Sequence, residues 1–166
     1  MTARTVFWIS AALIAIAVLG RTWAILYIDG RKYYELVDTG PYSICRNPLY
    51  VFSFFGAAGV GAASGSYTLA LATLAPTAAV FYALVLREER LLRERFGEAY
   101  IAYCARVPRF LPRFRNWRGV DWVQIRPSAV VATFFEALLF ALAYPAFFLI
   151  DLAQDNGLFP IMAVLP

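Results

Sequence analysis

The sequence predicts an all-α integral membrane protein with about four transmembrane helices and a cytosolic segment made of a helix and an extended strap. Of its 166 residues, 61% are hydrophobic and the mean hydropathy is +0.63, whereas apolar residues make up about 45–50% of an ordinary soluble domain. About 20 helical residues cross a hydrocarbon core about 30 Å thick. The runs that approach or exceed this length are residues 5–28, 48–63, 67–86 and 128–150. We expect residues 1–166 to form a single membrane domain.

The first run is expected to remain in the protein as a membrane helix. Its apolar stretch is long and is preceded only by Arg4, and Arg21, Thr22 and Trp23 do not form the small-residue cleavage site that ends a signal peptide.

The second and third runs are predicted to form a helical hairpin, because only residues 64–66 separate them. The second run is short but rich in glycine and alanine, which lets neighbouring helices approach closely in lipid. We expect this helix to begin at Pro48, with Asn47 as its N-cap, since both residue types are favoured at those positions.

Positive charge lies almost entirely on one side of the predicted helices. The loop 29–47 contains three basic residues and the segment 87–127 contains ten arginines, whereas the opposite side has only Arg4. The positive-inside rule therefore predicts that both polar segments are cytoplasmic and both termini lie outside. We expect the membrane to be a bacterial or archaeal plasma membrane. Orientation and anionic membrane lipids explain the arginines better than nucleic acid does, so no nucleic-acid partner is expected. The oligomeric state is left open.

The composition excludes several kinds of site. The chain contains no histidine, which removes His-based metal sites and Ser-His or Cys-His catalysis. Cys45 and Cys104 are too few for a disulfide framework or a zinc cluster, and we expect both to be small interior residues. No metal site is predicted.

The segment after the third run carries paired carboxylates. Helical periodicity predicts one mainly apolar stripe made of Phe81, Leu84, Val85, Glu88, Leu91, Leu92, Phe96, Ala99 and Tyr103. Glu88 is the charged residue on this stripe, and an inward carboxylate needs a cationic partner. Glu89 has two interpretations: a member of a site, or an exposed residue paired with Arg93 one turn later.

Beyond the carboxylates, Gly97 is expected to loosen the helix, and Pro108 and Pro112 to end it. The sequence "RVPRFLPRF" then predicts an extended basic and aromatic strap. The strap has a structural interpretation as well, that of an anchor at the membrane surface.

These segments resemble a known signature. "TGPYSICRNPLY" and "REERLLRERFGEAYIAYCARVPRFLP" are similar to the two halves of the motif of membrane S-adenosylmethionine methyltransferases, which include isoprenylcysteine carboxyl methyltransferases and phospholipid N-methyltransferases. The resemblance covers residues 39–112, with the two halves in the expected order on either side of the hairpin. It implies an S-adenosylmethionine pocket at the cytosolic end of the hairpin, and no G-x-G-x-x-G fingerprint is present.

The resemblance assigns roles by position. It implies cofactor contacts for Gly40, Tyr42, Arg46, Asn47, Tyr50, Glu88, Glu89, Tyr100, Val107 and Pro108, while Pro41, Pro48, Tyr103 and Phe110 fill further motif positions. Arg46 is our candidate both to meet the cofactor carboxylate and to orient an acceptor carboxylate during catalysis. Either glutamate can meet the cofactor ammonium or ribose hydroxyls. Two positions depart from the pattern: Asn47 replaces a histidine, and Phe52, where a small residue is usual, is expected to fill space beside the cofactor.

The predicted function is methyl transfer from S-adenosylmethionine to a small lipophilic acceptor that enters from the bilayer. An isoprenylcysteine-like carboxylate is favoured and a phospholipid amine comes next, since an amine must lose a proton and the chain has no histidine to accept it. One alternative is a non-catalytic membrane protein that keeps the scaffold and binds cofactor or lipid. Another is a membrane reductase that binds a nicotinamide.

Two charges lie within the apolar runs. Arg21 and Glu136 are seven or eight residues from the cytosolic ends of the first and fourth runs, a depth of about 10–12 Å. Opposite charges at matched depth predict that these two runs pack together through an Arg21–Glu136 pair. Alternatively, Arg21 extends to the membrane surface and Glu136 is protonated or faces a cavity.

Overall fold

The computed structural model describes residues 3–31 and 34–156, which form helices joined by turns and irregular segments, without a strand. The longer helices are α1 (Ala3–Ile28), α3 (Pro48–Ala63), α4 (Tyr67–Phe96), α6 (Pro127–Leu138) and α7 (Ala143–Asp155). The shorter ones are α2 (Pro41–Ile44), α5 (Glu98–Arg106) and the 3₁₀ turns η1 (Phe114–Asn116) and η2 (Leu139–Leu142). Three stretches, Thr5–Ile28, Tyr67–Phe96 and Pro127–Phe147, are long and apolar enough to cross a membrane, and α3 is a shorter apolar helix. The prediction of an all-α membrane protein is confirmed.

The fourth apolar run does not form one continuous helix over 128–150, as its length suggested. It is interrupted by the 3₁₀ turn η2 between α6 and α7. Pro145 supplies the physical reason, because a proline has no N–H for the carbonyl of Ala141, four residues earlier, and its ring collides with that carbonyl in a regular α-helix.

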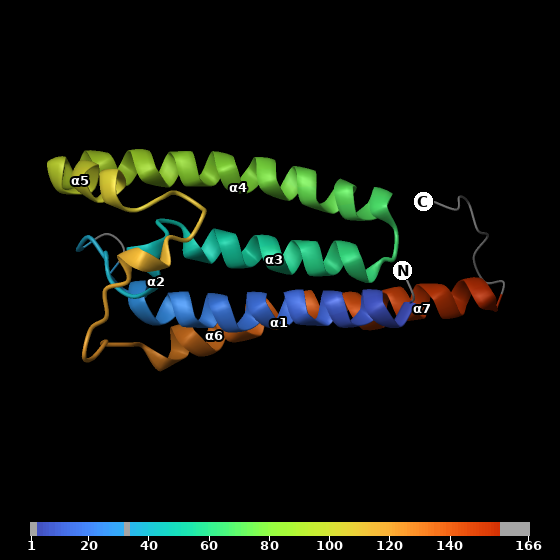
Figure 1. Ribbon diagram of the computed structural model, residues 1–166. Helices are drawn as coiled ribbons and strands as arrows, with labels where there is room; N and C mark the ends of the chain where they lie inside the picture. The colour runs from blue at the N-terminus through green and yellow to red at the C-terminus, as the bar shows by residue number, and fades with distance from the viewer. Residues whose placement is uncertain (1–2, 32–33, 157–166) are drawn as a thin grey trace.

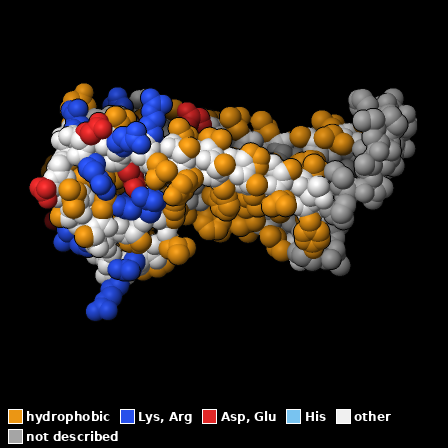
Figure 2. Space-filling model, turned by 90° about the horizontal axis from the view of Figure 1, so that it is seen from above, with side chains coloured by type: hydrophobic (Ala, Val, Ile, Leu, Met, Phe, Trp, Pro, Cys, Tyr) orange, Lys and Arg blue, Asp and Glu red, His pale blue; other side chains and the backbone are white. Residues whose placement is uncertain are grey.

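The long helices run side by side, so that the connections rich in arginine gather at one end (Figure 1). Residues 29–31, 34–47 and 97–126 form this arginine-rich end, while the α3–α4 turn lies at the other. Figure 2 shows the same division on the surface, with arginine side chains at one end and hydrophobic side chains along the rest. The predicted meeting of the two polar segments at one surface is therefore confirmed.

α1 and α3 approach closely because each has a glycine at a point of contact with the other helix. A methyl group at Gly20 on α1 would lie 2.1 Å from the Phe52 ring, and one at Gly59 on α3 would lie 2.7 Å from the Ile14 side chain. α1 therefore packs tightly on α3, and it packs on α6 through Ile14, Val18 and Ala137. α4 packs on α3 as the second half of the hairpin.

Candidate functional site

The strap, residues 107–118, lies across the first polar segment and is held there by its backbone. Gly40 N donates to Arg118 O at 2.8 Å, Arg46 N donates to Pro108 O at 2.9 Å, and Arg113 N donates to Ile44 O at 2.9 Å. The glycine break at Gly97, where φ is +51°, separates α4 from α5 and lets the chain return toward α2. Residues between 62 and 78 positions apart are thus brought together.

Aromatic side chains pack around the strap and hold it against α1 and α2. Tyr100, Tyr103 and Val107 are buried together, and the Tyr103 hydroxyl donates to the carbonyl of Tyr42 at 2.8 Å. Trp117 of the strap stacks on Trp23 of α1 with ring centroids 5.9 Å apart. Burial raises the pKa of the Tyr100 and Tyr103 hydroxyls well above their ordinary value, so both remain protonated at neutral pH.

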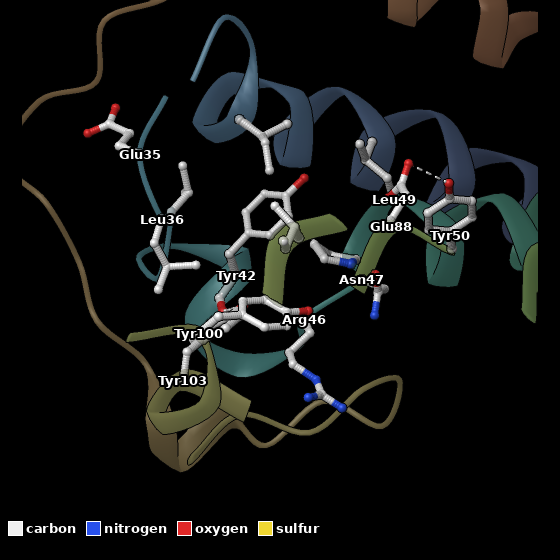
Figure 3. A pocket seen from close by; sticks show the side chains of 14 residues that line it. Glu35, Leu36, Tyr42, Arg46, Asn47, Leu49, Tyr50, Glu88, Tyr100 and Tyr103 are labelled. Carbon is white, nitrogen blue, oxygen red and sulfur yellow. Dashed lines mark hydrogen bonds between the residues drawn. The ribbon is translucent and has the colours of Figure 1, made fainter. Parts of the chain in front are cut away.

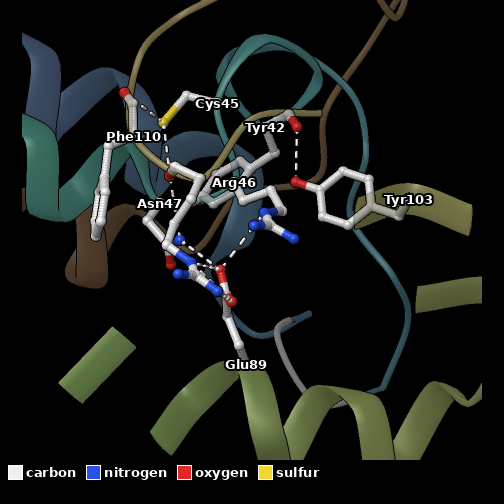
Figure 4. A network of polar contacts seen from close by, with 8 residues as sticks. Tyr42, Cys45, Arg46, Asn47, Glu89, Tyr103 and Phe110 are labelled. Atoms are coloured by element: carbon white, nitrogen blue, oxygen red, sulfur yellow. Dashed lines mark hydrogen bonds and ion pairs between the residues drawn. The ribbon is translucent and has the colours of Figure 1, made fainter. Parts of the chain in front are cut away.

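Glu89 is the centre of the polar network beneath the strap (Figure 4). Its side chain is buried and accepts hydrogen bonds from Arg109 Nη2 at 2.8 Å, from Arg109 Nε at 3.0 Å and from Asn47 Nδ2 at 3.1 Å. Asn47 Nδ2 also donates to the carbonyl of Arg109 at 3.3 Å. The bond to Glu89 raises the pKa of the Arg109 guanidinium. Glu89 therefore joins α4, the start of α3 and the strap.

Arg46 belongs to the same network, but its Nε–H group is not hydrogen-bonded within the described structure. Its Nε lies 3.4 Å from Glu89 Oε1, which is an ion-pair distance, yet this buried N–H makes no hydrogen bond in the described structure. The guanidinium of Arg46 is available to an additional anionic group, because the two Arg109 nitrogens and the Asn47 amide already occupy Glu89.

A cavity of about 50 Å³ lies between the loop after α1, α2, the start of α3, and α4 and α5 (Figure 3). Its lining consists of Ile28, Glu35, Leu36, Val37, Tyr42, Arg46, Asn47, Pro48, Leu49, Tyr50, Glu88, Leu92, Tyr100 and Tyr103. The buried hydroxyl of Tyr42 has no hydrogen-bond partner among the described residues. Tyr50 donates to Glu88 Oε1 at 3.0 Å on one side of the cavity, and Glu35 lies at the opposite side. The cavity therefore offers a cation, carboxylates and an unpaired hydroxyl to a small polar ligand.

The structure places six of the ten residues proposed as cofactor contacts on the wall of this cavity. They are Tyr42, Arg46, Asn47, Tyr50, Glu88 and Tyr100. The other four lie behind the wall. Glu89 binds the arginines, Val107 is buried among the tyrosines, Pro108 O accepts from Arg46 N, and Gly40 holds the strap.

The surroundings of Glu88 and Glu89 differ from those expected. Glu88 is partly exposed and lines the cavity, whereas Glu89 is the buried carboxylate with the arginine partners. The interpretation of Glu89 as an exposed residue paired with Arg93 is wrong, because the returning strap covers this face of α4 and supplies Arg109 instead.

Asn47 and Phe52 also differ from expectation. α3 begins at Pro48 as predicted, but the Asn47 side chain makes no capping hydrogen bond, because its amide is directed to Glu89 and Arg109. Phe52 does not line the cavity. It faces α1, where it fills the space above Gly20 and contacts Trp23 with ring centroids 6.3 Å apart. The expectation that Phe52 fills space next to a cofactor is not met.

Several cavity residues were not identified from the sequence. Glu35, Leu36 and Val37 come from the loop after α1, and Leu92 comes from α4. The position of Leu92 on the apolar stripe, one turn after Glu88, was a usable signal. The loop residues carried no periodicity or motif that could have indicated their place.

Cys45 is a structural thiol at this site. It is buried, and its Sγ donates to the carbonyl oxygens of Arg109 and Phe110 at 3.4 and 3.3 Å. Burial raises the pKa of the Cys45 thiol to about 11 from an ordinary value of 9.0. The thiol is therefore protonated at neutral pH and fastens the strap to the first polar segment.

Comparison with known proteins supports the first half of the motif and the start of the second. The family described as phospholipid methyltransferase matches residues 3–99. The chain is 38% identical to the nickel-cobalt-cadmium resistance protein NccN of Alcaligenes xylosoxydans xylosoxydans, over 96% of this chain and 78% of that protein. It is 34% identical to the cobalt-zinc-cadmium resistance protein CzcN of Cupriavidus metallidurans, over 95% of this chain and 76% of that protein. No solved structure matches the chain significantly.

Proposed function

Since the chain belongs to the phospholipid methyltransferase family, we propose that it is a membrane methyltransferase that uses S-adenosylmethionine and methylates a lipophilic acceptor. One observation carries the proposal: both halves of the motif contribute polar side chains to a single cavity at the arginine-rich end. The positive-inside rule supports a cytoplasmic position for that end, where the cofactor is available.

The donor set suits the chemistry of the cofactor. Arg46 would hold the cofactor carboxylate next to the start of α3, where backbone N–H groups and the helix dipole favour an anion. Glu88 would accept hydrogen bonds from the ammonium or the ribose hydroxyls, and the unpaired hydroxyl of Tyr42 adds a third polar contact. A molecule the size of S-adenosylmethionine needs more room than about 50 Å³, so binding requires the walls of the cavity to move apart.

When bound, S-adenosylmethionine supplies a methyl group attached to a positively charged sulfur. A lone pair of the acceptor forms a bond to the methyl carbon, the carbon–sulfur bond breaks, and its electron pair stays on the sulfur. The protein needs to align the two partners and exclude water, rather than supply a nucleophile. Tyr100 and Tyr103, which line the cavity and pack on Val107 of the strap, exclude water from one side. Arg46 is the proposed catalytic residue for a carboxylate acceptor, which it would orient.

An isoprenylcysteine-like carboxylate remains the favoured acceptor and a phospholipid amine the next. For an amine, a glutamate such as Glu88, a tyrosine or water would have to accept the proton, because the chain has no histidine.

The printed names of the relatives connect those proteins with resistance to nickel, cobalt, cadmium and zinc. Among the described residues, no three His, Cys, Asp or Glu side chains are placed to hold a metal ion. We propose that any contribution of this chain to metal tolerance passes through a methylated lipophilic product. A host carrying the Arg46→Ala variant should then lose the tolerance conferred by the wild-type chain.

The second candidate is a membrane protein that keeps the scaffold and binds cofactor or lipid without turnover. It is favoured by Asn47, which stands in place of the motif histidine and whose amide nitrogen donates to Glu89 and to the carbonyl of Arg109. The two candidates differ only in whether a methyl group is transferred.

Calorimetric titration of the purified protein with S-adenosylhomocysteine tests the cofactor site. We expect binding by the wild type, and weaker binding by Arg46→Ala and Glu88→Ala. The matched controls are Arg113→Ala, on the strap, and Glu98→Ala, on α5, which keep the charge change outside the cavity wall. Absence of wild-type binding contradicts the proposal. Binding without transfer of labelled methyl groups to any membrane lipid extract supports the second candidate.

A further inference from the structure

An apolar groove adjoins the polar cavity on the membrane side. It has a volume of about 530 Å³ and lies between α3, α4 and the strap. Val51, Phe54 and Phe55 form its wall on α3, and Ala78, Phe81 and Tyr82 form its wall on α4. Figure 2 views the molecule from the α4 side and shows hydrophobic side chains along this part of the surface.

The groove and the cavity share one residue, Tyr50. Its ring contacts Phe81 of the groove, with centroids 5.4 Å apart, while its hydroxyl donates to Glu88 on the cavity side. Tyr50 therefore stands at the boundary between a polar compartment and an apolar one. A ligand that spans this boundary has a polar head and an apolar tail.

The strap covers the end of the groove nearest the cavity. Phe110, Leu111 and Pro112 line it there, and the Phe110 ring lies 6.4 Å from the Tyr82 ring. The strap is thus the roof of the groove, whereas at the cavity it lies behind the wall, where Val107 packs on Tyr100 and Tyr103. A ligand whose head group lies in the cavity would keep the start of its tail under this roof.

The length of the groove follows from its helices. From Tyr50 to Phe55 along α3, and from Tyr82 to Ala78 along α4, the rise is about 6–8 Å. Ala78 is the smallest side chain in the lining and marks the end that lies deeper in the apolar part of the molecule. A tail longer than this leaves the groove for the surrounding lipid.

We infer that this groove binds one hydrocarbon tail of the methyl acceptor and contacts only the part of the tail nearest the head group. The small side chain of Ala78 keeps the deep end of the groove open. The inference rests on the proposed function, since the tail belongs to the molecule whose head enters the cavity. Lipids with different tail lengths should then bind the groove equally well. The aromatic walls should instead discriminate between lipids by the bulk of the tail close to the head group.

Two photoreactive lipids test this assignment in lipid nanodiscs. Both are octadecanoic acids carrying a diazirine, in one close to the carboxylate and in the other at the end of the chain. We expect the first to label wild-type residues 50–55, 78–82 or 110–112. Ala78→Phe fills the deep end of the groove and should reduce this labelling about tenfold, as expected for a binding site that becomes overpacked. Labelling by the second lipid should not depend on residue 78.

Ala79→Phe is the matched control, because the next residue on a helix points about 100° away and Ala79 is exposed outside the groove. Val51→Trp, which narrows the groove from the opposite wall, should repeat the effect of Ala78→Phe. Equal labelling of the Ala78→Phe and Ala79→Phe variants, or wild-type labelling confined to other helices, overturns the inference. Titration with S-adenosylhomocysteine separates the groove assignment from the proposed function. An Ala78→Phe variant that loses labelling but still binds S-adenosylhomocysteine supports the groove. A wild-type protein that does not bind S-adenosylhomocysteine contradicts the proposed function instead.

Discussion

The side-chain amide of Asn47 donates a hydrogen bond of 3.1 Å to Glu89 Oε1. This contact joins the first half of the motif to the second, across 42 positions of sequence. Asn47, at the position of the motif histidine, therefore donates to the Glu89 network, although an asparagine cannot exchange a proton near neutral pH.

The Asn47–Glu89 contact predicts a graded loss of stability. Asn47→Ala removes one hydrogen bond to a buried charge and should cost about 1.5–3 kcal/mol. Asn47→Asp should cost more, because it places a second carboxylate beside Glu89. Unfolding of the purified variants in detergent, followed by circular dichroism, measures the order. An Asn47→Asp variant as stable as the wild type would contradict the role given to this bond.

Release of the strap should be detectable at Cys45. Arg109→Ala removes the ion pair between the strap and Glu89, and the strap carbonyls of residues 109 and 110 accept from Cys45. We expect maleimide to modify Cys45 slowly in the wild type and much faster in Arg109→Ala, as measured by mass spectrometry of the cysteine peptides. Arg113→Ala is the control on the same strap. Equal rates at Cys45 in all three proteins would show that Arg109 does not hold the strap.

Alkaline pH should weaken the fold through Cys45. The folded protein holds the thiol proton up to a pKa of about 11, while the unfolded chain releases it near 9.0. Between these values the unfolded state binds fewer protons, so stability falls as pH rises through this window. Buried tyrosines with raised pKa values act in the same direction. The Cys45→Ala variant should therefore show a shallower fall between pH 9 and 11, and an unchanged slope would argue against the raised thiol pKa.

Gly40 should tolerate no side chain. Its backbone has φ +56° and ψ −133°, and a methyl group would lie 2.2 Å from the Tyr27 ring. Gly97 has nearly the same conformation, φ +51° and ψ −126°, but open space around it. Gly97→Ala should therefore cost only the backbone strain, about 1–3 kcal/mol. Gly40→Ala should cost more and weaken binding of S-adenosylhomocysteine. Equal losses in the two variants would mean that Tyr27 moves aside freely.

The predicted contact between the intramembrane charges is confirmed, since Arg21 Nη2 lies 3.7 Å from Glu136 Oε2 and Arg21 Nη1 donates to Ser53. A double-mutant cycle of Arg21→Met and Glu136→Gln, measured by thermal unfolding in nanodiscs, should give a favourable coupling of about 0.6–2 kcal/mol. Additive losses would mean that the two side chains act independently. The same cycle between Arg21 and Glu94, an exposed residue on α4, should be additive.

The sequence by itself determined the features that depend on local composition and period. Long apolar runs fixed the all-α membrane class, and the asymmetric arginines indicated which connections share one end. The motif halves identified six residues of the cavity wall, and matched depth predicted the pairing of Arg21 with Glu136.

Tertiary structure alone decided between neighbouring candidates. Glu88 and Glu89 are adjacent on one helix, and only the strap returning from residues 107–118 buries Glu89 and leaves Glu88 on the cavity wall. The same strap directs Asn47 away from capping α3, and Gly20 on α1 gives Phe52 its place. The physical reason is that burial and hydrogen-bond partners come from segments distant in sequence, so no local pattern around these residues could specify them.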